Sequence, residues 1–390
     1  MEIVKIPQSW GVKREPRTPM QHRNLVRQGL TFEQQFDWNN LFVDVLDIGD
    51  NRIICVGPPL YELASEIAFS DGTSVLPHHH LALDRCCITL VETNGPLNKL
   101  TLTNTKGDVT FNVHPISNIF KGIGFISTMQ KDEPISWIKQ WVHYYYTEYN
   151  LKGFLLYNNN CVDYTSSELK EALTSMYDDI VVEIIDWDVP FGPNPPTWDS
   201  DFAQYMQFEH CKYKYGWCAS YFVNHDIDEL LVLKDGVFIE NIVSQLKANN
   251  KSSIVYGNRN IDPYNIELKV SACHLDYDDI RFVDYLYYAD KINNPNLHGK
   301  LSITKWICIP EKSMLYQWKT HALDGSNDTI MYPKQSGDVY FAHFRSMMST
   351  NKSRNINPHP LNLTRCSESE LIKDELLELR LARSFKNYFD

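Results

Sequence analysis

Residues 122–129 read GIGFISTM, an apolar run that begins a regular alternation of strand-like and helix-like segments. A helix-like segment, ISWIKQWVHYYYTEYN, follows at 135–150. The alternation continues with an apolar run at 153–160, a helical segment at 166–177 and an apolar run at 181–188. Strands that alternate with helices in this way predict an α/β fold with a parallel sheet and helices on its faces. Ligands of such sheets bind beyond the carboxyl ends of the strands, so the polar residues that follow each run are candidate contacts.

The most informative carboxylates follow another apolar run, YFVN at 221–224. Asp226, Asp228 and Glu229 come next and lead into a second apolar run. Carboxylates this close repel one another, and placing them beside buried strands costs free energy unless a cation offsets the charge. In an extended Asp-x-Asp the two aspartates lie on one side of the chain, so both can bind one divalent cation while Ile227 turns into the core. Oxygen ligands favour Mn²⁺ or Mg²⁺, which also bind diphosphates; the alternative is an acidic turn between two strands.

The first third of the chain has a different pattern. Between residues 42 and 113, short apolar or alternating runs are separated by turn residues, which predicts a β-rich, sandwich-like domain. We place this domain at 1–118 and expect it to contribute no catalytic group. Three adjacent histidines at 78–80 cannot all face one metal ion from a strand or helix, so a surface loop is expected there rather than a metal site.

The bulk composition excludes some classes of protein. The chain has 390 residues and a formal net charge of −12, with no long basic run, so an extended nucleic-acid interface is not expected. Nine cysteines without a CxxC pair predict free thiols in a reducing compartment. Because no run of about 18 apolar residues occurs, we expect no transmembrane segment and a soluble, cytoplasmic protein. Peripheral contact with the inner face of a membrane and assembly into an oligomer are left open.

Residues 351–390 are expected to form a linker and an amphipathic helix. Ser367 and Glu370 have the spacing of a capping box, and Arg380 and Arg383 near the other end complement the helix dipole. We expect the leucine-rich face of this helix to dock on the body of the protein. Contact with a lipid surface is the alternative.

Four stretches of the chain occur in an order and spacing typical of one enzyme family. They are 128–133 with the helical segment after it, the strand end at 154–160, the segment from Ala203 and Gln204 through Cys211 to 226–229, and 305–310 followed by His321 and 343–346. Together they resemble the GT-A glycosyltransferases of family 92 and related bacterial capsule and lipopolysaccharide enzymes, although Gln140 stands where that family usually has Glu. The resemblance covers roughly residues 121–350 and implies a Rossmann-like GT-A catalytic domain at 119–350.

The resemblance implies a function and a set of residues. The expected reaction is inverting transfer of a sugar, with galactose as first choice, from a UDP-sugar to a glycan or glycoconjugate acceptor, as in polysaccharide biosynthesis. It assigns Mn²⁺ (or Mg²⁺) to Asp226, Asp228 and His343, although a lone histidine is also a common structural residue. Combined with the strand-end positions, it places the nucleotide sugar against Thr128, Lys131, Glu133, Asn158, Gln204, Asp226, Lys305 and Arg345.

Inversion at the anomeric carbon requires a base that accepts the proton of the acceptor hydroxyl. Asp324 is the expected base, because the bases of such enzymes commonly lie between the Asp-x-Asp motif and the late histidine. Asp262 and Asp328 are alternatives, and each of the three would also suit a turn. A non-catalytic sugar- or nucleotide-binding protein and a metal-dependent phosphohydrolase are the competing interpretations of the same residues.

Overall fold

The computed structural model forms two compact units. The first comprises residues 1–121, 188–218 and 314–320, and the second comprises 122–187, 219–313 and 321–390. The structure describes residues 1–17, 20–24, 29–193, 201–272, 275–289, 303–324, 327–332, 337–347 and 371–389. The domain limits expected from the sequence remain a prediction.

The first unit is built around two antiparallel-rich sheets, which confirms the predicted β-rich part. One sheet has the order β11-β3-β4-β8-β7 and the other the order β10-β9-β5-β6. Side chains from both sheets, such as Val45 and Phe69, share one buried core. The strands are β3 (Asp44–Gly49), β4 (Arg52–Gly57), β5 (Ala68–Ser70), β6 (Val75–Leu76), β7 (His78–Ala82), β8 (Cys87–Glu92), β9 (Lys99–Asn104), β10 (Gly107–Asn112) and β11 (His114–Pro115).

The other strands and helices of this unit are not part of these two sheets. They are β1 (Val4–Lys5), η1 (Gln8–Trp10), α1 (Met20–Arg23), α2 (Phe32–Gln35), β2 (Asn40–Phe42), η2 (Tyr61–Ser65), α5 (Phe202–Lys214), η3 (Gly216–Cys218) and β22 (Gln317–Trp318). The expectation of a loop at the three histidines is wrong, because these residues begin β7, an outer strand of its sheet. β7 pairs antiparallel with β8, and His80 Nδ1 lies 2.8 Å from Thr89 Oγ1 on that strand.

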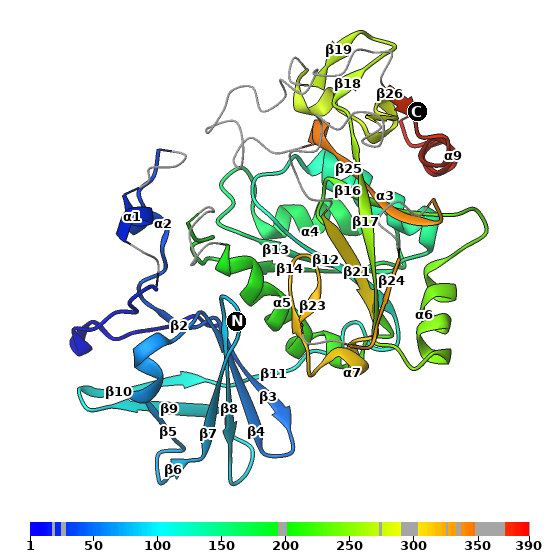
Figure 1. Cartoon of the computed structure of the whole chain (residues 1–390). Helices are drawn as coiled ribbons and strands as arrows, with labels where there is room; N and C mark the ends of the chain where they lie inside the picture. The colour runs from blue at the N-terminus through cyan, green and yellow to red at the C-terminus, as the bar shows by residue number, and fades with distance from the viewer. Residues whose placement is uncertain are drawn as a thin grey trace. The chain divides into compact units, whose positions relative to one another are not determined.

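The second unit contains the predicted alternation of strands and helices (Figure 1). Four neighbouring strands are parallel, in the order β14-β13-β12-β15. The chain runs β12 (Gly124–Gln130), α3 (Ile135–Tyr149), β13 (Gly153–Asn158), α4 (Ser166–Thr174), β14 (Val181–Asp186) and, after a segment of the first unit, β15 (Tyr221–Asn224). Phe154 and Leu156 share one face of β13, and both pack in a core with Trp141 and Tyr145 of α3.

Antiparallel pairing extends this sheet beyond β15. β21 (Thr304–Cys308) pairs with β15 and with β17 (Ser253–Ile261), and the far half of β17 runs parallel to β25 (Val339–Phe344). β25 in turn pairs antiparallel with β16 (Glu229–Leu233). The other elements of this unit are α6 (Ile239–Ala248), β18 (Tyr264–Asn265), β19 (Val270–Ser271), η5 (Tyr277–Asp279), η6 (Phe282–Asp284), β20 (Tyr287–Ala289), α7 (Pro310–Ser313), β23 (Leu323–Asp324), β24 (Thr329–Met331), η8 (Arg345–Met347), β26 (Leu371–Lys373) and α9 (Glu375–Ser384).

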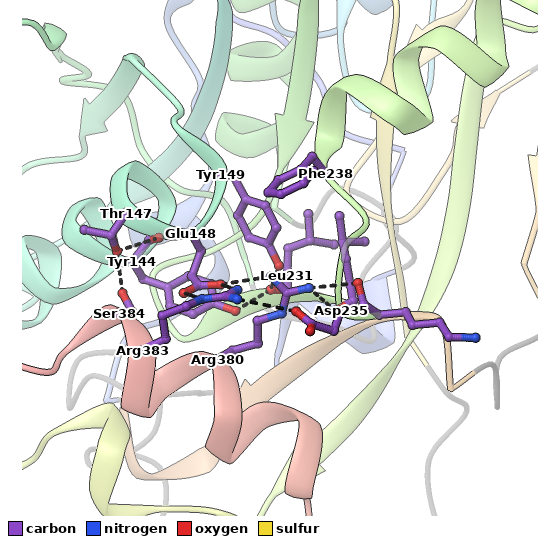
Figure 2. Close-up of polar contacts among 12 residues, drawn as sticks. Tyr144, Thr147, Glu148, Tyr149, Leu231, Asp235, Phe238, Arg380, Arg383 and Ser384 are labelled. Atoms are coloured by element: carbon purple, nitrogen blue, oxygen red, sulfur yellow. Dashed lines mark hydrogen bonds and ion pairs between the residues drawn. The ribbon is translucent and has the colours of Figure 1, made fainter.

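The C-terminal helix α9 docks on α3 and β16, as predicted (Figure 2). Arg380 Nη1 lies 3.0 Å from the carboxylate of Glu148 on α3, and both side chains are 1% exposed. The helix begins later than expected, because Asp374 is its N-cap and accepts a hydrogen bond from Leu377 N at 3.1 Å. Residues 371–373 form β26 instead of helix, and Ser367 lies outside the described residues.

Two further expectations concern the chain as a whole. The cysteines that the structure describes, at positions 55, 86, 87, 161, 211, 218 and 308, form no disulfide bond with one another. None of the helices in the described ranges is both long enough and apolar enough to cross a membrane.

Candidate active site

Three carboxylates lie where β15 turns into β16, at the carboxyl end of a parallel strand. Asn224, the last residue of β15, is aligned with Ser127 of β12. Ile227 is 4% exposed and packs in the core, as predicted, whereas the side chains of Asp226 and Asp228 are 28% and 20% exposed. The turn therefore presents both aspartates at the edge of the sheet where ligands of parallel sheets bind.

A buried lysine offsets part of this negative charge. Lys305 on β21 is fully buried, and its Nζ lies 2.8 Å from Asp226 Oδ2 and 3.0 Å from Glu229 Oε2. Burial acts against the charged form, but the two carboxylates outweigh it and raise the pKa of Lys305 above its ordinary value. Burial also raises the pKa of Glu229 to about 7, although Lys305 opposes that shift. Lys305 is therefore a permanent cation, and the structure pairs Asp226 with it.

A histidine on β25 reaches the same turn. Glu229 and His343 are partners in the antiparallel pairing of β16 and β25, and Phe344 N donates to Asp228 O at 2.8 Å. His343 Nε2 lies 3.1 Å from Asp228 Oδ2, and His343 Nδ1 is buried with no hydrogen-bond partner among the described residues. Ligand atoms of Asp228, Glu229 and His343 all lie within 4.8 Å of one another. Carboxylates suit Mg²⁺ and Mn²⁺, and imidazole suits transition metals, so this donor set fits Mn²⁺.

A second fixed cation lies close to this cluster. Arg345 follows β25 and interacts electrostatically with Asp228 and Glu229. Burial lowers its pKa, yet a guanidinium stays protonated in proteins. Three carboxylates thus face two fixed cations, Lys305 and Arg345. One bound divalent ion would make the site positive, which suits a diphosphate.

A buried histidine between two tyrosines supports the turn from behind. His225 is fully buried, its Nδ1 is hydrogen-bonded to the Tyr145 hydroxyl, and its Nε2 lies 3.0 Å from the Tyr256 hydroxyl. Burial and the charge of Lys305 hold the pKa of His225 well below its ordinary value, so the ring is neutral at pH 7. The Tyr145 hydroxyl also accepts a hydrogen bond from Leu231 N at 2.9 Å. These contacts join α3 to the turn itself and to β16.

These supporting contacts around His225 were not predicted from the sequence. One signal was present, because Trp141, Tyr145 and Tyr149 recur at a spacing of four residues and so share one face of α3. All three are buried, and the two residues that the Tyr145 hydroxyl contacts, His225 and Leu231, lie 80 and 86 residues away in sequence. Periodicity indicates that the face is covered, but it does not identify the covering residues.

Four of the predicted nucleotide contacts lie at the carboxyl ends of β12 and β13. Asn158 accepts a hydrogen bond from Gln130, and the carboxylate of Glu133 accepts one from Lys131 N. Thr128, Glu133 and Asn158 are buried, and the Thr128 hydroxyl has no hydrogen-bond partner in the described part of the chain. Of the four, Lys131 is the one with an exposed side chain.

The remaining predicted residues occupy other positions. Gln204 lies on α5 in the first unit, and Asp324 is exposed at the end of β23. Asp262 follows β17, and its Oδ1 accepts a hydrogen bond from Tyr264 N at 2.9 Å, which is a turn contact. Burial raises the pKa of Asp262, which moves it towards the range that suits a general base. Asp328 is exposed, and its backbone carbonyl accepts a hydrogen bond from the backbone N–H of Ser252, the residue before β17.

The part of the chain that contains this site carries a family signature. Residues 126–377 match the sequence profile described as glycosyltransferase family 92. The chain belongs to glycosyltransferase family 92. The matched range contains the turn with Asp226 and Asp228, as well as Lys305 and His343. The protein is therefore a glycosyltransferase, and the resemblance inferred from its sequence is confirmed.

Solved glycosyltransferase structures show partial similarity to this family 92 chain. The mannosyltransferase Ktr4p from S. cerevisiae is 14% identical over 57% of this chain and 70% of its own, with a TM-score of 0.31. Its complex with GDP is 14% identical over 49% and 57%, with a TM-score of 0.25. The apo structure of the bifunctional glycosyltransferase WbbM is 9% identical over 55% of this chain and 36% of its own, with a TM-score of 0.28. No curated protein matches the chain.

Proposed function

We propose that this glycosyltransferase transfers a sugar from a UDP-linked donor to a glycan or glycoconjugate acceptor, with inversion and with Mn²⁺ (or Mg²⁺) as cofactor. The observation that carries the proposal is the cluster of Asp228, Glu229 and His343, whose ligand atoms lie within 4.8 Å of one another. Its place at the carboxyl end of β15 is where an α/β sheet binds its ligand. UDP-galactose is the first donor to test.

The acidic and basic side chains of the site have different proposed roles. Asp228 and His343 would hold the cation, which when bound offsets the negative charge that develops on the leaving diphosphate. Lys305 keeps Asp226 and Glu229 in place, since its ammonium lies within 3.0 Å of a carboxylate oxygen of each. Arg345, which already interacts with the carboxylates, would add positive charge near the phosphates.

Asp324 is the proposed base, because it is exposed and so accessible to an acceptor hydroxyl. Asp262 is its competitor, because burial raises its pKa. Asp324→Asn should lower turnover by about 10²–10⁴-fold with little change in donor binding, and Asp262→Asn should matter much less. The opposite ranking of the two variants would transfer the role to Asp262.

The proposal is tested by following transfer from UDP-galactose and other UDP-sugars by NMR, with Mn²⁺ or with excess EDTA. We expect transfer only with the metal, and a product whose anomeric configuration is opposite to that of the donor. Full activity in EDTA would refute the requirement for a divalent cation. A retained anomeric configuration would remove the need for a base that accepts the acceptor's proton. Transfer from GDP-sugars in preference to all UDP-sugars would refute the assignment of a UDP-linked donor.

A further inference from the structure

The β-rich first unit contains a cavity that the proposed reaction does not use. Its volume is about 320 Å³, and it is lined by residues within 59–64 and 80–87 and by Arg17. That volume lies at the lower end of the range for small-molecule sites, roughly 300–1,000 Å³, and suits one sugar ring.

Two large residues that line the cavity have unusual backbone conformations. Tyr61 has a φ of 51° and Arg85 a φ of 61°. Side chains of this size rarely adopt the left-handed region, and such conformations persist where the surrounding structure holds them. Backbone strain at both places directs an aromatic ring and a guanidinium to the lining of one cavity.

Buried hydrogen bonds fix the walls that carry these two residues. Arg14 is fully buried, and its Nη1 donates to Pro59 O at 2.8 Å, two residues before Tyr61. On the other wall, the side chain of Gln317 makes hydrogen bonds of 3.0 and 2.8 Å with the backbone N and O of Asp84. The cavity is therefore preformed, which lowers the entropy cost of binding a ligand.

The charged groups around the cavity favour an anion. The guanidinium carbon of Arg17 lies over the ring of Tyr61, 5.4 Å from the ring centroid. Arg85 Nε lies 3.9 Å from Asp84 Oδ1. Asp84 also pairs with Lys319 at 3.3 Å, so the one carboxylate on the lining pairs with two cations, and Arg17 adds a further positive charge to the lining. This local excess of positive charge is notable in a chain with a net charge of −12.

The remaining lining suits a sugar ring. Burial, helped by the neighbouring histidines, lowers the pKa of His80 to about 4, so its ring is neutral at pH 7 and adds no charge. Leu60 and Leu83 add an aliphatic surface, and Tyr61 adds an aromatic one. Aliphatic and aromatic walls with a few polar groups are the usual lining of small-ligand sites.

We propose that this cavity binds one anionic sugar unit, a uronate or a phosphorylated sugar, of the glycan that the enzyme modifies. The arginines would bind the carboxylate or phosphate, and the tyrosine and leucine side chains would pack on the ring. The choice of a sugar rests on the proposed function, whereas the preference for an anion rests on the arginines alone.

The test measures binding of methyl glucuronoside, methyl glucoside, glucose 6-phosphate and inorganic phosphate to the full chain by titration calorimetry. We expect saturable binding of at least one anionic sugar, at least about tenfold tighter than of the neutral glucoside. Which of the two anionic sugars binds tighter identifies the anionic group. Equal binding of glucoside and glucuronoside, or phosphate binding as tight as that of glucose 6-phosphate, would overturn the proposal.

Variants locate the binding and separate it from catalysis. Arg17→Gln and Arg85→Asn should each weaken binding of the anionic sugar by at least about tenfold, and asparagine tolerates the left-handed backbone at position 85. Arg52→Gln is the matched control, because Arg52 is an exposed arginine of the same unit that pairs with Asp50. Asp228→Asn should bind the anionic sugar normally even if transfer fails. Unchanged binding in both arginine variants, or loss in Asp228→Asn, would refute a site in this cavity.

Discussion

Two clusters of charged side chains lie at opposite ends of β16, and they differ in charge balance. At Leu233, Arg380 donates to the backbone carbonyl at 2.7 Å, and Arg380 and Arg383 both contact Glu148 (Figure 2). With Asp235 beside Arg383, two arginines meet two acids. At Glu229, three carboxylates meet two cations, and His343 Nδ1 has no partner among the described residues. The balanced cluster holds helix α9 in place, whereas the unbalanced one has capacity for a bound cation.

The largest expected effect is the loss of catalysis in Asp228→Asn. This change keeps the shape of the side chain but removes the charge that would hold a cation, so transfer should fall by at least about 10³-fold. The unfolding free energy should stay within about 0.5 kcal/mol of the parent or rise. Transfer assays and urea unfolding measure the two quantities. Asp338→Asn, which changes an exposed carboxylate of the same unit, should leave both unchanged.

The balanced cluster should show the opposite behaviour. Glu148→Gln leaves Arg380, which is 1% exposed, without its carboxylate, and breaking a buried pair costs about 3–5 kcal/mol. Turnover per folded molecule should be unchanged. Glu183→Gln is the control, because Glu183 pairs with the exposed Lys170 and such pairs contribute at most about 1 kcal/mol. Loss of turnover without loss of stability in Glu148→Gln would make the two clusters functionally alike.

Two tyrosine variants on α3 test whether this helix positions the turn that carries the aspartates. Tyr145→Phe removes the hydroxyl that contacts His225 and Leu231 N, and Tyr144→Phe removes one that donates to Leu231 O at 2.7 Å. Both should lose about 1–2 kcal/mol of stability. Only Tyr145→Phe should also lower kcat, by about tenfold, because it alone reaches the turn that carries Asp226 and Asp228. Equal turnover in the two variants would show that the tyrosine–histidine network is purely structural.

A third cluster, in the first unit, predicts a modest pH effect. Asp44 is fully buried and contacts His114 (2.6 Å), His210 (3.0 Å) and Lys214 (2.7 Å). Burial would raise the pKa of Asp44, but these three partners hold it well below its ordinary value. A depressed pKa stabilises the fold above the unfolded pKa, near 4, and that stability is lost as the pH falls towards the folded pKa.

The loss of this stabilisation should be visible in the slope of unfolding free energy against pH. Between about pH 4 and 2, Asp44→Asn should have a shallower fall in unfolding free energy than the parent, by up to about 1.4 kcal/mol per pH unit. Asp47→Asn, in the same strand but partly exposed, serves as the control. Identical slopes for Asp44→Asn and the parent would show that the cluster does not titrate on unfolding.

The local pattern of the sequence was sufficient for much of the fold. Apolar runs and helical periodicity predicted β12, α3, β13, α4 and β14, because these elements follow one another and pair as neighbours. The pairing of β16 with β25 joins residues more than 100 positions apart, and no local pattern specifies it. The histidines of β7 were misplaced for a similar reason, since their strand is defined by its pairing with β8.

In the candidate active site, too, local motifs identified residues, whereas contacts made by long-range strand pairing were not predicted. Asp228 and His343 were named from motifs, and the structure brings them to 3.1 Å. Glu229 was part of the acidic motif but was not expected in the cluster with Asp228 and His343, because strand alternation alone does not show that it pairs with His343. Lys305 was expected near a phosphate, and its burial between Asp226 and Glu229 depends on the pairing of β15 with β21.

The proposed role of Asp228 and His343 is to bind a divalent cation together with a nucleotide diphosphate. The most direct test is calorimetric titration of UDP into the protein with Mn²⁺ or with EDTA, for the parent, Asp228→Asn and His343→Ala. The parent should bind UDP with Mn²⁺ and lose at least about tenfold in affinity in EDTA, because two protein side chains leave most of the coordination shell for the phosphates. Both variants should bind UDP weakly under both conditions while keeping the parent's apo melting temperature. UDP binding that is equally tight in EDTA, or a His343→Ala variant that unfolds early yet binds Mn²⁺ and UDP normally when folded, would contradict this role.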